Sequence, residues 1–176
     1  MPTLNTYMLY ISYQGIYDGQ NYEFANTPNQ IGKAFNAGYS CMVDVWRLDS
    51  KLYVGTLDAP IEVSEKYLQG NRFWISAMND DMYNWLLTQP IKKYPNYFKS
   101  PEPYTPYVTT SSGHDLVYSN TPSNNNCIIV LPEIVDRGLL STVKLRNYGI
   151  CSAFGTFIKR YRNEGSPFYG DINVPN

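Results

Sequence analysis

The sequence predicts an α/β fold: a reduced TIM-barrel-like (β/α) fold with about eight strands and with several outer helices missing. Apolar runs of strand length recur along the whole chain, whereas segments with helical spacing are few. With 176 residues, 43% of them hydrophobic and 16% charged, the chain can form one folded domain spanning residues 1–176. A full (β/α) barrel takes about 250 residues, so extended segments must replace several helices.

The first expected strand covers residues 8–13, and a helix follows it. Thr27 is a suitable N-cap, because its hydroxyl can accept a hydrogen bond from the free amides of the first turn. Pro28 fits the first helical position, and Gly38 is placed to close the helix. The apolar stripe of this helix consists of Ile31, Ala34 and Phe35.

The next part of the chain predicts two strands, a hairpin and a second helix. The strands are expected at residues 41–46 and 72–78, with a hairpin extension of the former at 51–54. Ser64 is expected to cap a single helical turn between them. Asn79 then starts a helix that runs through Leu87 and ends at Pro90.

The second half of the chain is mostly extended. Residues 94–106 contain four prolines, so this segment cannot hold a helix. Strands are expected at residues 96–100, 106–110, 115–120, 127–131 and 150–154. Leucines and valines at helical spacing predict one further helix at residues 135–147.

Composition limits the classes of partner and location. The net charge of −1 gives no support for nucleic acid or an anionic membrane as a partner. Cys41, Cys127 and Cys151 are an odd number at wide spacing, so we expect buried free thiols and neither disulfides nor a zinc site. No basic segment followed by an apolar run marks a secretory signal, and no run reaches the roughly 20 apolar residues of a membrane span. We therefore expect the cytoplasm or a virion as the location.

Several short segments share a specific order. They are YISYQG at 10–15, ANTP at 25–28, SCMVDVW at 40–46, LYVGTLDAP at 52–60, WISAMN at 74–79, IIVLPE at 128–133 and GICSAF at 149–154. In this order they resemble the glycerophosphodiester phosphodiesterase-like family of PLC-like phosphodiesterases, whose members are TIM barrels. The resemblance implies that fold for residues 8–154, with residues 90–126 matched only loosely.

The resemblance also implies that the catalytic groups have been lost. The family uses two histidines as general acid and base. The first falls at Tyr13, beside Gln14 where the family has arginine, and the second falls within Thr56-Leu57. Tyrosine has a pKa of about 10, and threonine and leucine do not transfer protons at neutral pH, so no substitution keeps the role.

The metal ligands and substrate contacts of the family are reduced as well. Its Glu-x-Asp pair directs two carboxylates to one face of a strand, because side chains alternate. Here that pair is Met42-x-Asp44, and Ala25 replaces a further glutamate. Ser76 and Met78 stand where the family has a histidine and a lysine. The resemblance therefore implies a degenerate member with no metal, no cofactor and no catalytic residue.

The residues at the family's site positions mark a vestigial pocket at the carbonyl end of the expected barrel. They are Tyr13, Gln14, Asn26, Asp44, Trp46, Asp58, Trp74, Ser76, Met78 and Glu133. Asp44, Asp58 and Glu133 are weak candidates for a remaining cation site. The alternative is that Asp44 and Asp58 hydrogen-bond loop amides or pair with a basic neighbour, while Glu133 caps a strand exit.

Two other polar groups have a functional and a structural interpretation. His114, with Asp115 beside it, is either a relocated acid/base pair or an exposed loop histidine, and its Ser/Gly-rich turn favours the second. The cluster Lys159, Arg160 and Arg162 is either a phosphate-binding patch or a solvated face, and again the second is favoured.

Together these observations favour a catalytically inactive phosphodiesterase-like barrel that serves as an interaction or structural protein. The 17 tyrosines and the frequent asparagines suggest a viral protein, with other virion proteins as partners. The first alternative is a binding module that keeps the old mouth for a phosphate- or sugar-containing ligand. The second is a divergent phosphodiesterase with a rebuilt site. An open aromatic mouth at Tyr13, Trp46 and Trp74 would favour the binding module, whereas a mouth filled by side chains would favour a structural role.

Overall fold

The computed structural model describes residues 9–103, 105–118, 127–131, 149–156 and 158. Its strands are β1 (Leu9–Tyr13), β2 (Ser40–Leu48), β3 (Lys51–Gly55), β4 (Pro60–Val63), β5 (Phe73–Ala77), β6 (Tyr97–Lys99), β7 (Tyr107–Thr109), β8 (Asp115–Val117), β9 (Cys127–Val130) and β10 (Gly149–Ser152). Its helices are α1 (Pro28–Asn36), α2 (Asp80–Thr88) and the short 3-10 helix η1 (Tyr22–Phe24). The expected helix at residues 135–147 lies outside the described residues.

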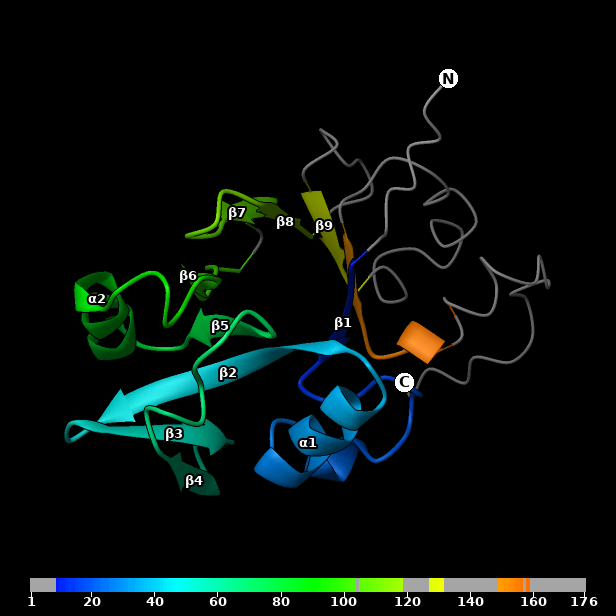
Figure 1. Ribbon diagram of the computed structural model, residues 1–176, viewed down its shortest axis with the longest axis horizontal. Helices are drawn as coiled ribbons and strands as arrows, with labels where there is room; N and C mark the ends of the chain where they lie inside the picture. The colour runs from blue at the N-terminus through cyan, green and yellow to red at the C-terminus, as the bar shows by residue number, and fades with distance from the viewer. Residues whose placement is uncertain (1–8, 104, 119–126, 132–148, 157, 159–176) are drawn as a thin grey trace.

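The strands form one ten-stranded sheet, which confirms a mixed α/β fold (Figure 1). Seven strands are parallel neighbours in the order β6-β5-β2-β1-β10-β9-β8, and β7 pairs antiparallel with β8. The far half of β2 pairs antiparallel with β3, which pairs with β4. Each expected strand overlaps a strand of the structure, while β4 and η1 were not predicted. Ser64 caps a turn, where a turn of helix was expected, and its hydroxyl accepts from the Tyr67 amide.

The alternating side chains of the central strands sort into two separate apolar clusters. Odd-numbered residues of β2 and β5 pack under the two helices. This helix-side cluster contains Ile31, Cys41, Val43, Val45, Phe73, Ile75, Ala77, Met82 and Leu86, among others. Because α1 and α2 each present one apolar stripe, they bury it against this face of the sheet.

The other face of the sheet forms a second cluster, drawn from seven strands. Its buried members are Ile11, Met42, Trp74, Phe98, Leu116, Ile128, Val130 and Cys151. These residues come from β1, β2, β5, β6, β8, β9 and β10. All seven strands therefore direct side chains into one common apolar interior. Cys41, Cys127 and Cys151 are buried, as the sequence predicts.

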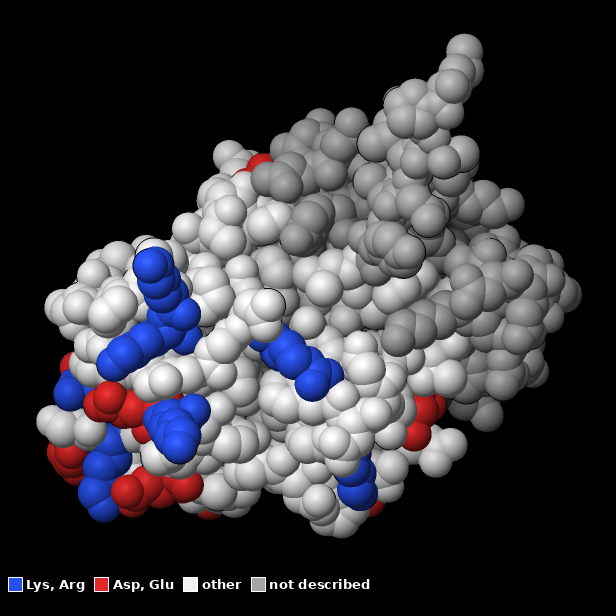
Figure 2. All heavy atoms as spheres, viewed as in Figure 1, with Lys and Arg blue, Asp and Glu red and all other residues white. Residues whose placement is uncertain are grey.

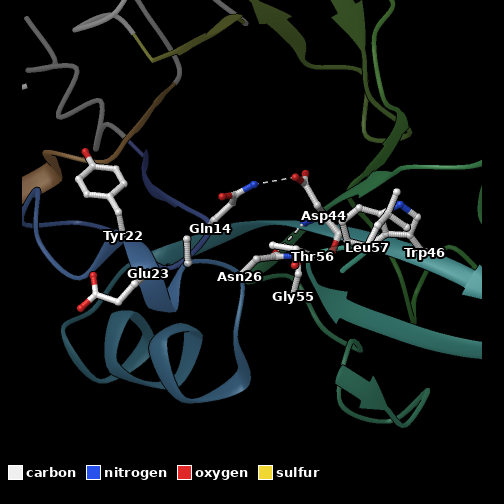
Figure 3. A pocket seen from close by; sticks show the side chains of 10 residues that line it. Gln14, Tyr22, Glu23, Asn26, Asp44, Trp46, Gly55, Thr56 and Leu57 are labelled. Carbon is white, nitrogen blue, oxygen red and sulfur yellow. Dashed lines mark hydrogen bonds between the residues drawn. The ribbon is translucent and has the colours of Figure 1, made fainter. Parts of the chain in front are cut away.

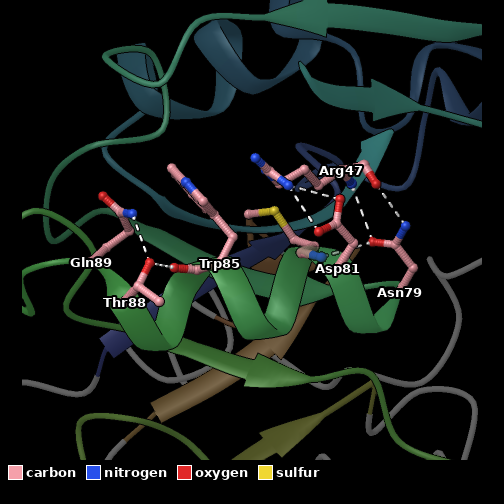
Figure 4. Close-up of polar contacts among 7 residues, drawn as sticks. Arg47, Asn79, Asp81, Trp85, Thr88 and Gln89 are labelled. Atoms are coloured by element: carbon pink, nitrogen blue, oxygen red, sulfur yellow. Dashed lines mark hydrogen bonds and ion pairs between the residues drawn. The ribbon is translucent and has the colours of Figure 1, made fainter. Parts of the chain in front are cut away.

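Both helices begin where the sequence predicts. The Thr27 side chain accepts from the Gln30 amide at the start of α1, with Pro28 in the first turn. At the start of α2, Asn79 Oδ1 accepts from the Met82 amide (Figure 4). The same Asn79 side chain also bonds both backbone polar atoms of Arg47 in β2. It therefore fixes α2 against the strand as well as capping it.

Ion pairs surround the α2 end of the molecule. Figure 2 shows basic and acidic side chains interspersed on this side of the visible face. The pairs are Arg47–Asp81, Lys51–Glu62 and Lys99–Asp80. Each has at least one partner more than half exposed, so solvent screens each pair and its contribution to stability is small.

The edge strand β6 is hydrogen-bonded by the turn between β7 and β8. The Ser111 amide donates to the Tyr97 carbonyl at 2.8 Å. The Tyr97 amide in turn donates to Ser111 Oγ at 2.8 Å, and this hydroxyl donates to the Pro95 carbonyl. Through Ser111, hydrogen bonds thus connect β6, at one end of the row of parallel strands, to the turn that precedes β8, at the other end.

Candidate functional site

The carboxyl ends of β1, β2 and β5 meet at one edge of the sheet. The register pairs Tyr13 with Met42 and Asp44 with Ser76. Tyr13 and Ser76 lie at or next to the carboxyl ends of β1 and β5, and Asp44 lies near the end of the part of β2 that pairs in parallel with β5. This is the edge at which α/β folds place their ligands.

A short hydrogen bond joins Gln14 to Asp44 at this edge. Gln14 Nε2 lies 2.6 Å from Asp44 Oδ2, and Gln14 has a positive φ of 54° immediately after β1. Burial raises the pKa of the Asp44 carboxyl, although hydrogen bonds from Gln14 and Ser76 act in the opposite direction. Asp44 is therefore a partly buried carboxyl group held by uncharged partners.

Asn26 fixes the backbone on both sides of this pair. Its side chain accepts from the Asp44 amide at 3.0 Å and donates to the Asp44 carbonyl at 2.8 Å. It donates to the Gly55 carbonyl at 2.9 Å as well, while its own backbone carbonyl accepts from the Gly55 amide. Asn26 is buried and fully engaged with backbone, so its role is to join β2 and β3 beside the site.

A cavity of about 340 Å³ opens beside the Gln14–Asp44 pair. In Figure 3, Tyr22 and Glu23 of η1 lie on one side of it, and Trp46 and Leu57 lie on the other. The lining residues are Gln14, Tyr22, Glu23, Ala25, Asn26, Asp44, Trp46, Gly55, Thr56 and Leu57. They combine a polar floor with aromatic and aliphatic walls, which is a typical composition of a ligand site.

Two tyrosines lie near Asp44 on the interior side. Burial raises the pKa of Tyr13 above its ordinary value, and the neighbouring Asp44 raises it further. Burial also raises the pKa of Tyr118, with Cys151, Tyr13 and Asp44 as its further causes. Both phenols are therefore neutral and protonated at physiological pH. Neither can act as the general base that the family's histidine would supply.

The structure brings together most of the residues that the sequence marked. Gln14, Asn26, Asp44 and Trp46 line the cavity, and Ser76 Oγ lies 3.5 Å from Met78 Sδ at the end of β5. Ser76 is paired with Asp44 in the sheet and lowers the pKa of its carboxyl by a hydrogen bond, and Asp44 raises the pKa of Tyr13.

Among the described residues that the sequence marked, those that do not line the cavity are Tyr13, Asp58, Trp74, Ser76 and Met78. Trp74 is only 2% exposed and belongs to the buried interior cluster, so it does not form the expected open mouth. Asp58 is exposed in the turn between β3 and β4, and it follows the lining residue Leu57 without belonging to the lining itself. Glu133 lies outside the described residues.

The donor set near Asp44 does not fit the divalent cation of the family. Met42 is buried in the interior cluster, and the Cys151 thiol donates to its sulfur at 3.8 Å. Ala25 supplies no carboxylate, and Asp58 is not among the lining residues. Among the described residues, no three His, Cys, Asp or Glu side chains are grouped as metal ligands. One carboxylate is far from the six or more oxygen atoms that calcium takes.

His114 is less exposed than a loop histidine was expected to be. It lies between β7 and β8, partly buried, with its ring edge-to-face against Trp74 at 5.6 Å between centroids. Its Nδ1 lies 3.0 Å from Ser112 Oγ, and burial lowers its pKa. Asp115 accepts a hydrogen bond from Thr109. His114 precedes β8, whereas Asp44 lies toward the carboxyl end of β2, so the two are not at the same end of the parallel strands.

The cluster Lys159, Arg160 and Arg162 lies outside the described residues.

Sequence reasoning missed part of the cavity wall. Tyr22 and Glu23 come from η1, which has no clear hydrophobic period, whereas Thr56 and Leu57 of the β3–β4 turn were named only as the position of the family's second histidine. The one signal available in the sequence was the presence of large side chains within polar segments, and the structure shows that these side chains are exposed. Tyr22 is 40% exposed and Leu57 is 65% exposed.

Comparison with protein-family models, with curated proteins and with solved structures gave no match to this chain. Within the part of the chain that the structure describes, no helix is both long enough and apolar enough to cross a membrane.

Proposed function

We propose that this chain is a catalytically inactive, phosphodiesterase-like barrel that works by binding, as an interaction or structural protein, with virion proteins as candidate partners. The barrel is supported by the apolar interior to which seven parallel strands contribute. It is supported further by Ser111, which bonds β6 from the opposite end of the strand order. A closed sheet would leave no free edge there.

The hydrogen-bonded pair Gln14–Asp44 is the main observation that supports a catalytically inactive chain. The family's arginine and histidine positions hold Gln14 and Tyr13, and both side chains are neutral beside Asp44. The ionisable side chains of the cavity lining are Tyr22, Glu23 and Asp44. A general acid and a general base each contribute roughly 3–5 kcal/mol of barrier lowering. No pair among these residues is arranged to replace them.

The binding module is the better supported alternative, because the cavity beside Asp44 is open and partly aromatic. Its ligand would sit at the rim, since the interior below Asp44 is filled by the apolar cluster. A phosphate group is disfavoured there, because Glu23 and Asp44 would repel it. The divergent phosphodiesterase would require His114 and Asp44 to act on one substrate.

Hydrolysis of glycerophosphocholine tests the proposal directly. The purified chain is assayed with magnesium, calcium or manganese beside a heat-denatured control. We expect equal rates in the two samples. Tyr13→His alone should not restore activity, because catalytic groups act as a unit and their effects are not additive. Metal-dependent turnover by the wild-type chain that Asp44→Ala or His114→Ala abolishes would overturn the proposal.

A further inference from the structure

Asp44 is a carboxylate without a counter-ion in the described structure. Its side chain is bonded by the uncharged groups of Gln14 and Ser76. The ion pairs among the described residues involve Asp81, Glu62 and Asp80 instead. A partly buried charge costs free energy unless an opposite charge offsets it. An added cation at this position would therefore gain more than it would on the open surface.

The walls of the cavity suit a cation with an apolar stem. Trp46 is 9% exposed, while Tyr22, on the opposite side in Figure 3, is 40% exposed. Aromatic faces attract guanidinium and ammonium groups, and arginine most often. Leu57, which is 65% exposed, adds aliphatic surface to the same lining. The methylene groups of arginine or lysine pack on such surface while the charged head reaches a polar group.

The charge of the lining separates the possible ligands. The ten lining residues include Glu23 and Asp44, and no Lys, Arg or His. Glu23 lies on the exposed rim, with its carboxylate directed away from Asp44 in Figure 3, so its contribution is long-range. An anionic ligand would be repelled. A neutral polyol would find hydrogen-bond partners but would leave the charge of Asp44 uncompensated.

We propose that the cavity between η1 and the β3–β4 turn binds the guanidinium or ammonium head of an arginine or lysine side chain, with Asp44 as its counter-ion. The inference rests on the proposed function, because it names the group by which a partner protein would be held. The head approaches Asp44 past Gln14, and the aliphatic stem lies between Tyr22 and Leu57. A free small cation offers the same chemistry, so the test must separate the two sources.

The test is a titration followed by NMR chemical-shift changes of the side-chain amides of Gln14 and Asn26. Four probes are compared: N-acetylarginine amide, its neutral isostere N-acetylcitrulline amide, methylguanidinium, and methyl glucoside. We expect the arginine amide to bind about tenfold more tightly than the citrulline amide, because only the charged head pairs with Asp44. Tighter binding of the arginine amide than of methylguanidinium identifies a side chain as the natural ligand. Equal affinity identifies a free cation.

Substitutions show which carboxylate is responsible for the binding of the arginine amide. Asp44→Asn should reduce arginine affinity about tenfold, and Glu23→Gln about twofold, through long-range attraction. Asp58→Asn is the matched control, because it removes the same charge from an exposed residue outside the lining, and it should leave affinity unchanged. If Asp44→Asn does not fold, the affinities of the wild-type chain for the arginine amide and the citrulline amide decide whether the cavity binds a cation.

Equal binding of the arginine and citrulline amides would overturn the proposal. So would an effect of Asp58→Asn as large as that of Asp44→Asn, or tighter binding of methyl glucoside than of the arginine amide. These results are independent of the hydrolysis assay. A chain that neither binds arginine nor hydrolyses glycerophosphocholine contradicts the cation site alone, whereas one that hydrolyses it contradicts the proposed function.

Discussion

The side chain of Asn26 pairs with both backbone polar atoms of Asp44, much as a neighbouring strand would. Regular pairing of β1 with β2 ends at Tyr13 and Met42, two residues earlier. Asn26 itself has a positive φ of 60°, a conformation that asparagine adopts more readily than most residues. One amide thus extends the sheet past the end of β1 and holds the backbone of the candidate site in place.

Replacing Asn26 by alanine should destabilise the fold strongly. The change removes three side-chain hydrogen bonds, one buried and two part-buried, and takes a partner from the backbone groups of Asp44 and Gly55. We expect a loss of about 3 kcal/mol in the free energy of unfolding, measured by urea denaturation. Asn29→Ala, on the exposed side of α1, is the control and should change stability by less than about 0.5 kcal/mol. Similar losses for the two variants would contradict the role of Asn26.

The start signals of both helices could be predicted from the sequence because they are local. Thr27 with Pro28, and Asn79 with the acids after it, act within one turn of helix. The pairing of Asn26 with Asp44 and of Asn79 with Arg47 could not be predicted, because it depends on where β2 lies in the folded sheet.

The strand β4 was missed for a different physical reason. Three of its four residues are exposed, so burial imposes no alternation on its sequence. The cavity was only partly predicted, since the sequence marked Gln14, Asn26, Asp44 and Trp46 but not Tyr22 and Glu23 of η1. The membership in the phosphodiesterase-like family stays a prediction.

Gly15 is a position where the backbone leaves no room for a side chain. It has a φ of 83°, and an added Cβ would lie 2.9 Å from backbone atoms of Gln30 and Ile31. Gly15→Ala should therefore cost about 2–4 kcal/mol, because backbone atoms cannot move aside as a flexible side chain can. Gly32→Ala in α1 is the matched variant. A Cβ there meets nothing within 4 Å, so it should stabilise the fold by about 0.5–1 kcal/mol.

Thermal unfolding of the two glycine variants shows directly whether each substitution stabilises or destabilises the fold. The midpoint should fall for Gly15→Ala and rise for Gly32→Ala. A fall of similar size in both would show that the close contact between Gly15 and α1 does not determine the outcome.

Ser111 should protect the edge strand β6 from exchange with solvent. Its hydroxyl accepts from the Tyr97 amide and donates to the Pro95 carbonyl, both at 2.8 Å. Ser111→Ala removes both bonds, and we expect a loss of about 1–2 kcal/mol together with faster deuterium exchange at the Tyr97 amide. Ser64→Ala, in a turn remote from β6, is the control for the exchange rate at Tyr97. Unchanged exchange in Ser111→Ala would contradict a sheet that is joined at this point.

Asp44 should make stability depend on pH in an unusual direction for a carboxylate. Burial holds its folded-state pKa above the ordinary value of 3.8, so the folded chain binds more protons than the unfolded chain between the two values. The contribution of Asp44 to stability is then fully present below about pH 4, and it is lost as the pH rises through the folded-state pKa. At neutral pH the ionised group is a cost, which Asp44→Asn removes while an oxygen remains to accept from Gln14.

The variant should accordingly be more stable than the wild-type chain at pH 7, by on the order of 1 kcal/mol, and the difference should shrink toward pH 4. Urea denaturation of both proteins at several pH values measures this, with Asp58→Asn as an exposed control that shows no such trend. A gap that widens as the pH falls would mean that the ionised Asp44 stabilises the fold. Higher stability combined with weaker arginine binding would instead show that Asp44 is kept at a cost to stability, as is common for residues that serve a function.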